Sequence, residues 1–167
     1  MYAMAYITHE SIPLFANEDS ELLILGSLPS VKSREDGFYY AHPRNRFFKV
    51  LSSLFNEEEP ISIMDRKLFL NKHKIALNDV VYACEIHMSS DSSIKNVTPI
   101  NILCVLNTHK KIKKIAINGG AAKKYFDKYL LKDIPSGVQV IYLPSTSPAN
   151  AKMNLCDLVN EYQKVLK

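Results

Sequence analysis

Apolar residues in this chain gather in four short runs that are separated by longer, partly polar stretches. Each run is continuous rather than alternating, which favours a strand that is covered on both faces of a sheet. The four predicted strands are Leu22–Leu25, Ile75–Tyr82, Ile115–Ile117 and Val138–Leu143.

The stretches between these runs repeat apolar residues at helical spacing, most clearly at Phe47, Leu51 and Phe55. Prolines near the expected starts of two helices place those starts at Thr98-Pro99 and Ser147-Pro148. The predicted helices span residues 47–55, 100–107, 120–131 and 155–166. Strands that alternate with helices predict an α/β protein with a mainly parallel, four-stranded sheet and right-handed crossovers.

The segments that follow the four strands are all rich in small or amide residues. Because parallel sheets bind ligands at the carboxyl ends of their strands, these segments together form the first candidate for a binding site. The alternative is that they are ordinary turns, which use the same residue types. The segments are 26–30 (GSLPS), 84–93 (CEIHMSSDSS), 118–121 (NGGA) and 144–150 (PSTSPAN).

Composition adds few constraints. A chain of 167 residues, 47% of them hydrophobic, suits one globular domain over residues 1–167. The net charge of +4 permits a nucleic-acid partner without requiring one. The three cysteines lie far apart and lack metal-ligand spacing, so we expect reduced thiols, no bound metal and a cytoplasmic protein. Neither a leader-like start nor an apolar run of about 20 residues, the length of a membrane span, is present.

Several common catalytic motifs are absent. No glycine fingerprint of a dinucleotide or P-loop site occurs, and there is no Gly-x-Ser-x-Gly elbow. Acidic residues are not concentrated at the strand ends, which argues against a two-metal phosphoryl site. The strand ends instead carry Asn, Ser, Tyr and backbone amides. These groups suit a site that stacks a flat ring, hydrogen-bonds its edge and holds a phosphate without a metal.

Two stretches of the chain resemble the motifs of a known family. Residues 26–30 (GSLPS) followed by 37–48 (GFYYAHPRNRFF) resemble the first motif of the uracil-DNA glycosylase superfamily, and 144–150 (PSTSPAN) resembles its second. The likeness spans nearly the whole chain and is greatest to the mismatch-specific and the hypoxanthine-DNA (deoxyinosine) glycosylase branches. It implies a three-layer αβα fold around the four-stranded, mainly parallel sheet, and no cofactor.

The chain departs from the family pattern at Leu28. The uracil-cleaving branches carry a catalytic Asn or Asp at that position, whereas leucine can neither orient a water molecule nor accept a proton. In the hypoxanthine branch, the resemblance places an essential amide at Asn45 and implicates a second at Asn118. Structural alternatives remain open, since Asn45 can cap the following helix and Asn118 can serve as a turn residue before two glycines.

The resemblance also implies residues that bind the extruded base. Tyr40 matches a stacking aromatic, with partial burial as the alternative. Gly26 and Ser27, in the first-motif turn, are assigned to base binding as well. Asn78 lies in a pattern like that around a base-reading Asn, although bracing a neighbouring loop is the alternative that we favour, and Asp79 could fix a loop or poise a water molecule.

DNA contacts are expected from the second motif and from the arginines beside the pocket. Pro148 is expected to open a helix whose N-terminal amides favour an anion. Arg44, with Arg46 beside it, is a candidate phosphate contact, and surface solvation is the alternative. The basic run His109–Lys114 precedes a strand and should lie at the opposite end of the sheet. The DNA-binding candidates of the second motif are Ser145, Thr146, Ser147 and Asn150.

These patterns predict a monomeric, metal-independent, monofunctional DNA glycosylase. Its partner would be DNA containing a deaminated base, above all hypoxanthine in deoxyinosine, removed by hydrolysis of the N-glycosidic bond in base-excision repair. Extruding the base costs about a few kcal/mol, and neutral dipoles at the charges that develop can lower the barrier by several kcal/mol. The alternatives are a uracil or mismatch-specific glycosylase and, from another class, a catalytically silent DNA- or nucleotide-binding module.

Overall fold

A four-stranded parallel sheet forms the centre of the protein. The computed structural model describes residues 4–87 and 94–167. The sheet has the order β3-β2-β6-β7, and each pair of neighbouring strands is parallel. This arrangement confirms the predicted α/β class with a four-stranded parallel sheet. The strands are β2 (Leu22–Gly26), β3 (Ile75–Asp79), β6 (Lys114–Asn118) and β7 (Gln139–Leu143).

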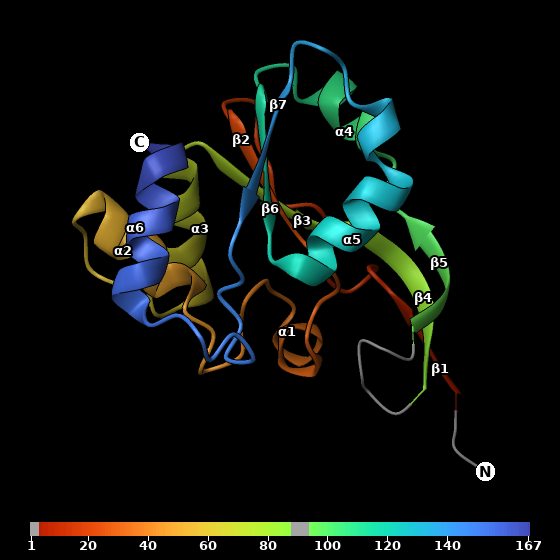
Figure 1. Cartoon of the computed structure of the whole chain (residues 1–167), viewed down its shortest axis with the longest axis horizontal. Coiled ribbons are helices and arrows are strands. Elements are labelled where there is room, and N and C mark those ends of the chain that lie inside the picture. Colours follow the sequence, from red (N-terminus) through yellow and green to blue (C-terminus); the bar gives the residue numbers. More distant parts are fainter. Residues whose placement is uncertain (1–3, 88–93) are drawn as a thin grey trace.

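Helices cover both faces of this sheet, which gives the three-layer αβα architecture expected from the resemblance (Figure 1). One face is covered by α2 (Phe47–Phe55), α3 (Ile63–Lys72) and α6 (Leu155–Leu166). The other is covered by α4 (Ile102–Thr108) and α5 (Gly120–Tyr129). Side chains of β2 alternate between two buried clusters, with Ile24 packed toward α2 and Leu23 and Leu25 toward α5.

A second, smaller sheet corrects one prediction. The predicted strand Ile75–Tyr82 is in fact two strands, because the chain leaves the parallel sheet at Val80. Residues 84–87, expected in a loop, therefore belong to a strand, and residues 88–93 of that expected loop lie outside the described part of the chain. The antiparallel sheet consists of β1 (Met4–Thr8), β4 (Val81–His87) and β5 (Ile94–Pro99), in the order β1-β4-β5.

Neither proline-based helix start is correct. Thr98 and Pro99 end strand β5, and α4 begins after Asn101, whose side chain accepts a hydrogen bond from the Cys104 N–H. Residues 147–150 form a turn rather than a helix. The last helix, α6, begins only after Asn154, so no helix N-terminus at Pro148 is available to bind an anion.

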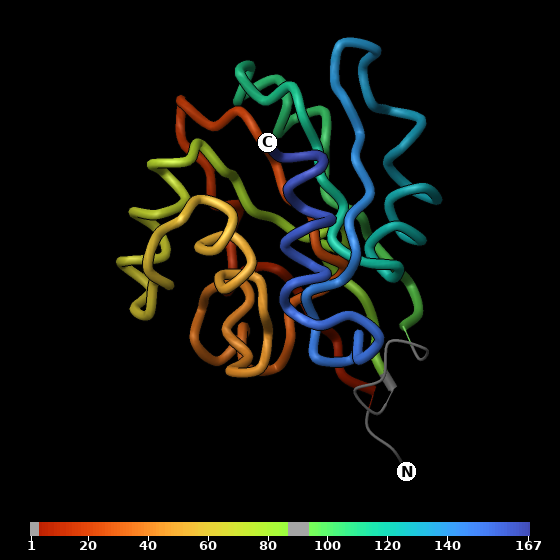
Figure 2. Tube along the Cα trace, turned by 60° about the vertical axis from the view of Figure 1, so that its left-hand side comes forward, coloured from red at the N-terminus to blue at the C-terminus, as the bar shows by residue number. Residues whose placement is uncertain are grey.

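Two helices were not predicted at all. Helix α1 (Val31–Asp36) is short and polar, and it is bounded by the side-chain cap Ser30 and by Gly37 in the left-handed region at φ 71°. Helix α3 starts from a capping box between Ser62 and Asp65. Helix α1 lies at the carboxyl end of β2, where the loops after β2 and β7 also meet (Figures 1 and 2).

Candidate active site

A cavity of about 740 Å³ lies at the carboxyl ends of the parallel strands. Its walls come from the loops after β2 and β7, from the end of β3 and from the start of α5. All the predicted site residues except Asn78 and Arg44 line this cavity. The fold therefore brings together residues from opposite ends of the chain, as the position of the strand ends predicts.

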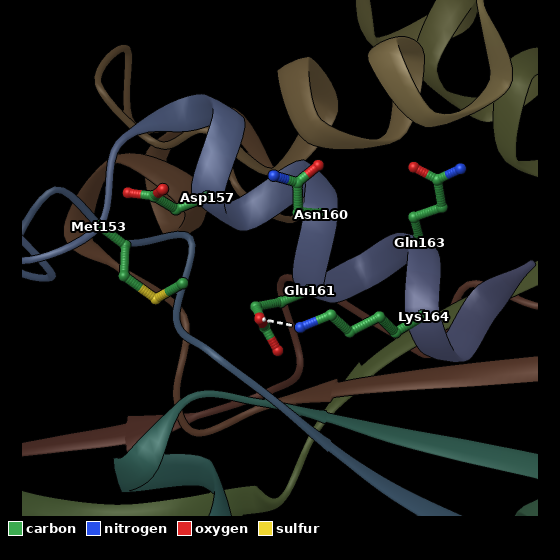
Figure 3. A pocket seen from close by; sticks show the side chains of 6 residues that line it. All are labelled: Met153, Asp157, Asn160, Glu161, Gln163 and Lys164. Atoms are coloured by element: carbon green, nitrogen blue, oxygen red, sulfur yellow. Dashed lines mark hydrogen bonds and ion pairs between the residues drawn. The ribbon is translucent and has the colours of Figure 1, made fainter.

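A second hollow lies on the outer side of α6 (Figure 3). It is built from one helix and the turn before it, and Lys164 crosses it to pair with Glu161 at 2.6 Å. No predicted site residue lies there, so we take the first cavity as the candidate active site. The hollow is lined by Met153, Asp157, Asn160, Glu161, Gln163 and Lys164.

Asn45 lines the cavity from the segment that leads into α2. Its Oδ1 accepts hydrogen bonds from the N–H of Phe47 (3.0 Å) and from the hydroxyl of Thr146 (2.9 Å). Because the Phe47 N–H can only donate, these contacts fix which end of the amide is the oxygen. Within the described residues, the Asn45 Nδ2 group has no hydrogen-bond partner. The side chain thus supports the start of α2 and still keeps its N–H groups available to a ligand.

Asn118, at the end of β6, is 8% exposed and is bound to Thr146 through both of its polar atoms. Its Oδ1 accepts from the Thr146 N–H and its Nδ2 donates to the Thr146 hydroxyl, each at 3.1 Å. The Thr146 carbonyl accepts from the Arg46 N–H at 3.0 Å. Thr146 is 1% exposed, and all of its polar groups are engaged. Thr146, expected at the DNA, thus links Asn118 to Asn45 and has no polar group free for a ligand in this arrangement.

Tyr40 presents one face of its ring to the protein and lines the cavity. The ring stacks on Phe47 with centroids 3.9 Å apart, and the backbone is held at φ 53°, a region that residues with side chains rarely adopt. The hydroxyl is buried and has no hydrogen-bond partner among the described residues. Burial raises the pKa of Tyr40, and the negative charge of Asp79 raises it further.

The loop after β7 is held in shape by its own residues and by Arg46. The Ser145 hydroxyl accepts from the Ser147 N–H (3.1 Å), and the Asn150 amide donates to the Ser145 carbonyl (2.9 Å). The Arg46 guanidinium donates to the carbonyls of Ser147 and Asn150, both at 2.9 Å, and to that of Met153. Arg46 thus holds this loop in place through three carbonyls. The sequence had suggested that Arg46 could bind a phosphate beside Arg44.

Asn78, an expected base contact, does not line the cavity, whereas the next residue, Asp79, does. Successive side chains leave a strand in opposite directions. The Asn78 Oδ1 accepts hydrogen bonds from the Tyr39 hydroxyl (3.3 Å) and from the Asp79 N–H (2.9 Å). These two contacts favour the structural alternative for Asn78, in which its side chain braces the segment that bears Tyr39.

Sequence reasoning missed the partner of Asp79. His9, which follows β1, places its Nε2 2.9 Å from Asp79 Oδ2 and its Nδ1 2.5 Å from the Ile12 carbonyl. Burial lowers the pKa of His9, but the hydrogen bond to Asp79 and its charge, with the Ile12 carbonyl, outweigh burial and raise the pKa overall. No local pattern marks this pair, because 70 positions separate its members.

The arginines near the cavity also differ from expectation. Arg44 is exposed and does not line the cavity. Arg34, on the unpredicted helix α1, does line it, and its Nε is buried without a partner among the described residues. Arg34 is therefore the cation best placed to meet an anionic ligand inside the cavity.

Two features are absent from the part of the chain that the structure describes. Among residues 4–87 and 94–167, no cluster of three or more His, Cys, Asp or Glu side chains has the arrangement of a metal site. In the same part of the chain, no helix is both long and apolar enough to cross a membrane.

Comparison with known proteins connects this geometry to a family. The model of the uracil DNA glycosylase superfamily matches residues 13–167. A hypoxanthine DNA glycosylase of Methanosarcina barkeri (strain Fusaro / DSM 804) is 32% identical over 145 residues, which are 86% of this chain and 89% of the relative. One of Methanosarcina acetivorans is 32% identical over 143 residues, 85% and 88% of the two chains. A solution NMR structure from Methanosarcina acetivorans, described as a candidate uracil DNA glycosylase, has a TM-score of 0.79 at 29% identity and covers 93% of this chain and 94% of its own.

Proposed function

The chain belongs to the uracil DNA glycosylase superfamily, and from this premise we propose that it removes hypoxanthine from deoxyinosine in DNA. The reaction hydrolyses the N-glycosidic bond and leaves an abasic site for base-excision repair. Two relatives that share 32% identity over most of this chain are hypoxanthine DNA glycosylases, which favours this base over others.

The observation that carries the proposal is the Asn45 amide in the cavity. Leu28 also lines the cavity, at the position where the uracil-cleaving branches carry a polar catalytic group, and it can supply no hydrogen bond. The Asn45 Oδ1 is occupied by Phe47 and Thr146, so the group offered to a substrate is the Nδ2 donor. We assign this donor to the base, on which negative charge develops as the glycosidic bond breaks. A preorganised donor of this kind typically lowers the activation free energy by about 3–4 kcal/mol.

Tyr40 suits the other requirement, a flat surface for the extruded purine. One face of the ring is covered by Phe47, and the other is proposed to stack on the base. Extrusion costs about a few kcal/mol, and it costs less where inosine opposes a base other than cytosine, because such a pair is already imperfect. Gly26 and Ser27 line the same cavity and would contact the base edge.

DNA binding is assigned to the rim of the cavity. Ser145, Ser147 and Asn150 lie on a loop whose backbone is already held by Arg46, so binding this loop to a phosphate costs little additional ordering. Arg34 inside the cavity and the exposed Arg44 supply positive charge for the flanking phosphates.

The test is release of hypoxanthine from a duplex with a single deoxyinosine, read as strand cleavage after alkali. Wild-type protein should cleave the inosine strand, and Asn45→Ala should lose at least about 100-fold in single-turnover rate. Lys132→Ala, in the short 3-10 helix Leu131–Asp133 and outside the cavity lining, is the matched control and should keep the wild-type rate. Cleavage of uracil strands without cleavage of inosine strands would support a uracil glycosylase instead. Tight binding of the duplex without any cleavage would identify a catalytically silent binding module.

A further inference from the structure

A buried ion pair of His9 and Asp79 contributes Asp79 to the lining of the cavity, and the reaction described above does not use it. His9 and Asp79 are each 4% exposed. The Ile12 carbonyl can only accept, so the Nδ1 of His9 carries a proton, and the Nε2 faces the Asp79 carboxylate at 2.9 Å. The raised pKa of His9 favours an imidazolium, which makes the pair a cation beside an anion. Removing two charges from water is costly, and pairing with hydrogen bonds to the remaining polar atoms is what offsets that cost.

One oxygen of the pair is left for a ligand. Oδ2 of Asp79 is engaged by His9, whereas no hydrogen bond to Oδ1 is found within the described residues. This Oδ1 lies over Gly26, its register partner on β2, and a Cβ at Gly26 would overlap it. Both residues line the cavity. The glycine therefore leaves open the space that the carboxylate oxygen occupies at the cavity floor.

The chemistry of deamination gives this oxygen a use. Adenine has a ring nitrogen with a lone pair at N1, whereas hypoxanthine has an N1–H beside its carbonyl. A carboxylate oxygen attracts the N–H and repels the lone pair. We propose that Asp79, positioned by His9, reads the ring N–H of the deaminated base and so separates hypoxanthine from its parent adenine. This inference rests on the proposed function, and it identifies the group that selects the substrate.

The positive charge of His9 offsets the negative charge that Asp79 would otherwise place beside the base. The departing base gains negative charge, and an isolated carboxylate beside it would oppose cleavage. The imidazolium makes the pair neutral overall, so the carboxylate can accept a hydrogen bond without placing a net charge beside the base. The buried hydroxyls of Tyr39 and Tyr40 add no charge, because burial and the charge of Asp79 raise both of their pKa values.

The experiment titrates free hypoxanthine, 1-methylhypoxanthine and adenine into the whole protein and follows binding by NMR. Wild-type protein should bind hypoxanthine roughly 10- to 100-fold more tightly than either other base, the usual range for a hydrogen bond to a charged group. Asp79→Ala should lose this preference. Asp79→Asn should keep most of it, because the proton on His9 Nδ1 leaves Nε2 free to accept from the new amide, whose oxygen then faces the cavity.

Three results would overturn the inference. They are wild-type protein that binds 1-methylhypoxanthine or adenine as tightly as hypoxanthine, wild-type protein that binds no hypoxanthine, and a folded Asp79→Ala variant that keeps the preference. If Asp79→Ala fails to fold, the wild-type comparison of the three bases decides alone. Base binding is measured without cleavage, so a protein that prefers hypoxanthine yet releases none from DNA would refute the proposed function and leave this inference standing.

Discussion

The Thr146 hydroxyl donates a hydrogen bond to Oδ1 of Asn45 across 2.9 Å, and so joins the first-motif segment to the loop after β7. The same hydroxyl accepts from Asn118 Nδ2, so three polar side chains form one chain of hydrogen bonds. Because Asn118 donates to the Thr146 hydroxyl, that hydroxyl donates to Asn45 Oδ1. The Nδ2 group of Asn45 therefore faces the cavity with its N–H groups available to a ligand. Asn118 acts on Asn45 through Thr146 in this arrangement.

Removing the Thr146 hydroxyl should therefore cost both stability and activity. Thr146→Val keeps the shape but leaves the buried Asn118 Nδ2 and the Asn45 Oδ1 each short of a partner. We expect a loss of about 1–3 kcal/mol in the free energy of unfolding and a slower release of hypoxanthine. Thr146→Ser keeps the hydroxyl and is the control. Equal denaturation midpoints for the Val and Ser variants would show that the hydroxyl is not a structural link.

The substitution Asn45→Asp distinguishes the role of the Oδ1 acceptor of Asn45 from that of its Nδ2 donor. The carboxylate keeps an acceptor for the Phe47 N–H and for Thr146, so the free energy of unfolding should change by no more than about 1 kcal/mol. The N–H donor is lost, so the single-turnover rate on inosine should fall by at least about 100-fold. A variant that keeps the wild-type rate would show that Asn45 acts through its oxygen.

Gly26→Ala tests whether the cavity floor needs the glycine. The added Cβ would overlap Oδ1 of Asp79, which cannot swing away while His9 holds its other oxygen. We expect a loss of roughly 1–3 kcal/mol in stability and a reduced affinity for hypoxanthine. The matched control is Gly137→Ala, where the added methyl group meets no atom within 4 Å. Identical behaviour of the two variants would refute the tight contact at Gly26.

The His9–Asp79 pair should make stability depend on pH. The pKa of His9 is raised above its ordinary 6.5 in the folded protein. Its contribution is therefore complete below the unfolded value near 6.5 and is lost as the pH rises through the higher folded value. His9→Gln should cost more unfolding free energy at about pH 5.5 than at about pH 9, measured by denaturant titration. A cost that is larger at the higher pH would contradict a protonated His9.

Arg46→Lys tests the clamp on the second-motif loop. Lysine keeps the charge but cannot reach the carbonyls of Ser147, Asn150 and Met153 together, because it lacks the planar fork of arginine. We expect faster amide hydrogen exchange in residues 145–153 and weaker binding to DNA. Arg44→Lys, at an exposed position, should leave exchange in that loop unchanged. Unchanged exchange in Arg46→Lys would mean that the loop is held by its internal hydrogen bonds alone.

The sequence predicts the central sheet well because its strands are continuous apolar runs. The same signal fails at Ile75–Tyr82, where the chain crosses from one sheet to the other at Val80, directly after the polar pair Asn78-Asp79 that interrupts the run. Helices α1 and α3 were missed because their apolar periodicity is weak. Their caps, Ser30 with Gly37 and Ser62 with Asp65, were the available signal.

The position of the cavity could be predicted from the strand ends, but which side chains reach it and which are buried behind it could not. Asn78 and Asp79 are adjacent, and only the orientation of β3 decides which of them reaches the cavity. Thr146 has the residue type of a phosphate contact, and its burial follows from the position of Asn118 on another strand. His9 has no pattern around it, since its role arises from how the small sheet packs against the large one.

The link between Thr146 and Asn45 spans 101 positions of the chain. During synthesis, the segment bearing Asn45 emerges long before the loop that orients it. A growing polypeptide would thus contain Asn45 without Thr146, whose hydroxyl orients the Asn45 amide. The complete chain of hydrogen bonds from Asn118 to Asn45 can therefore form only after the segment that bears Thr146 has been synthesised.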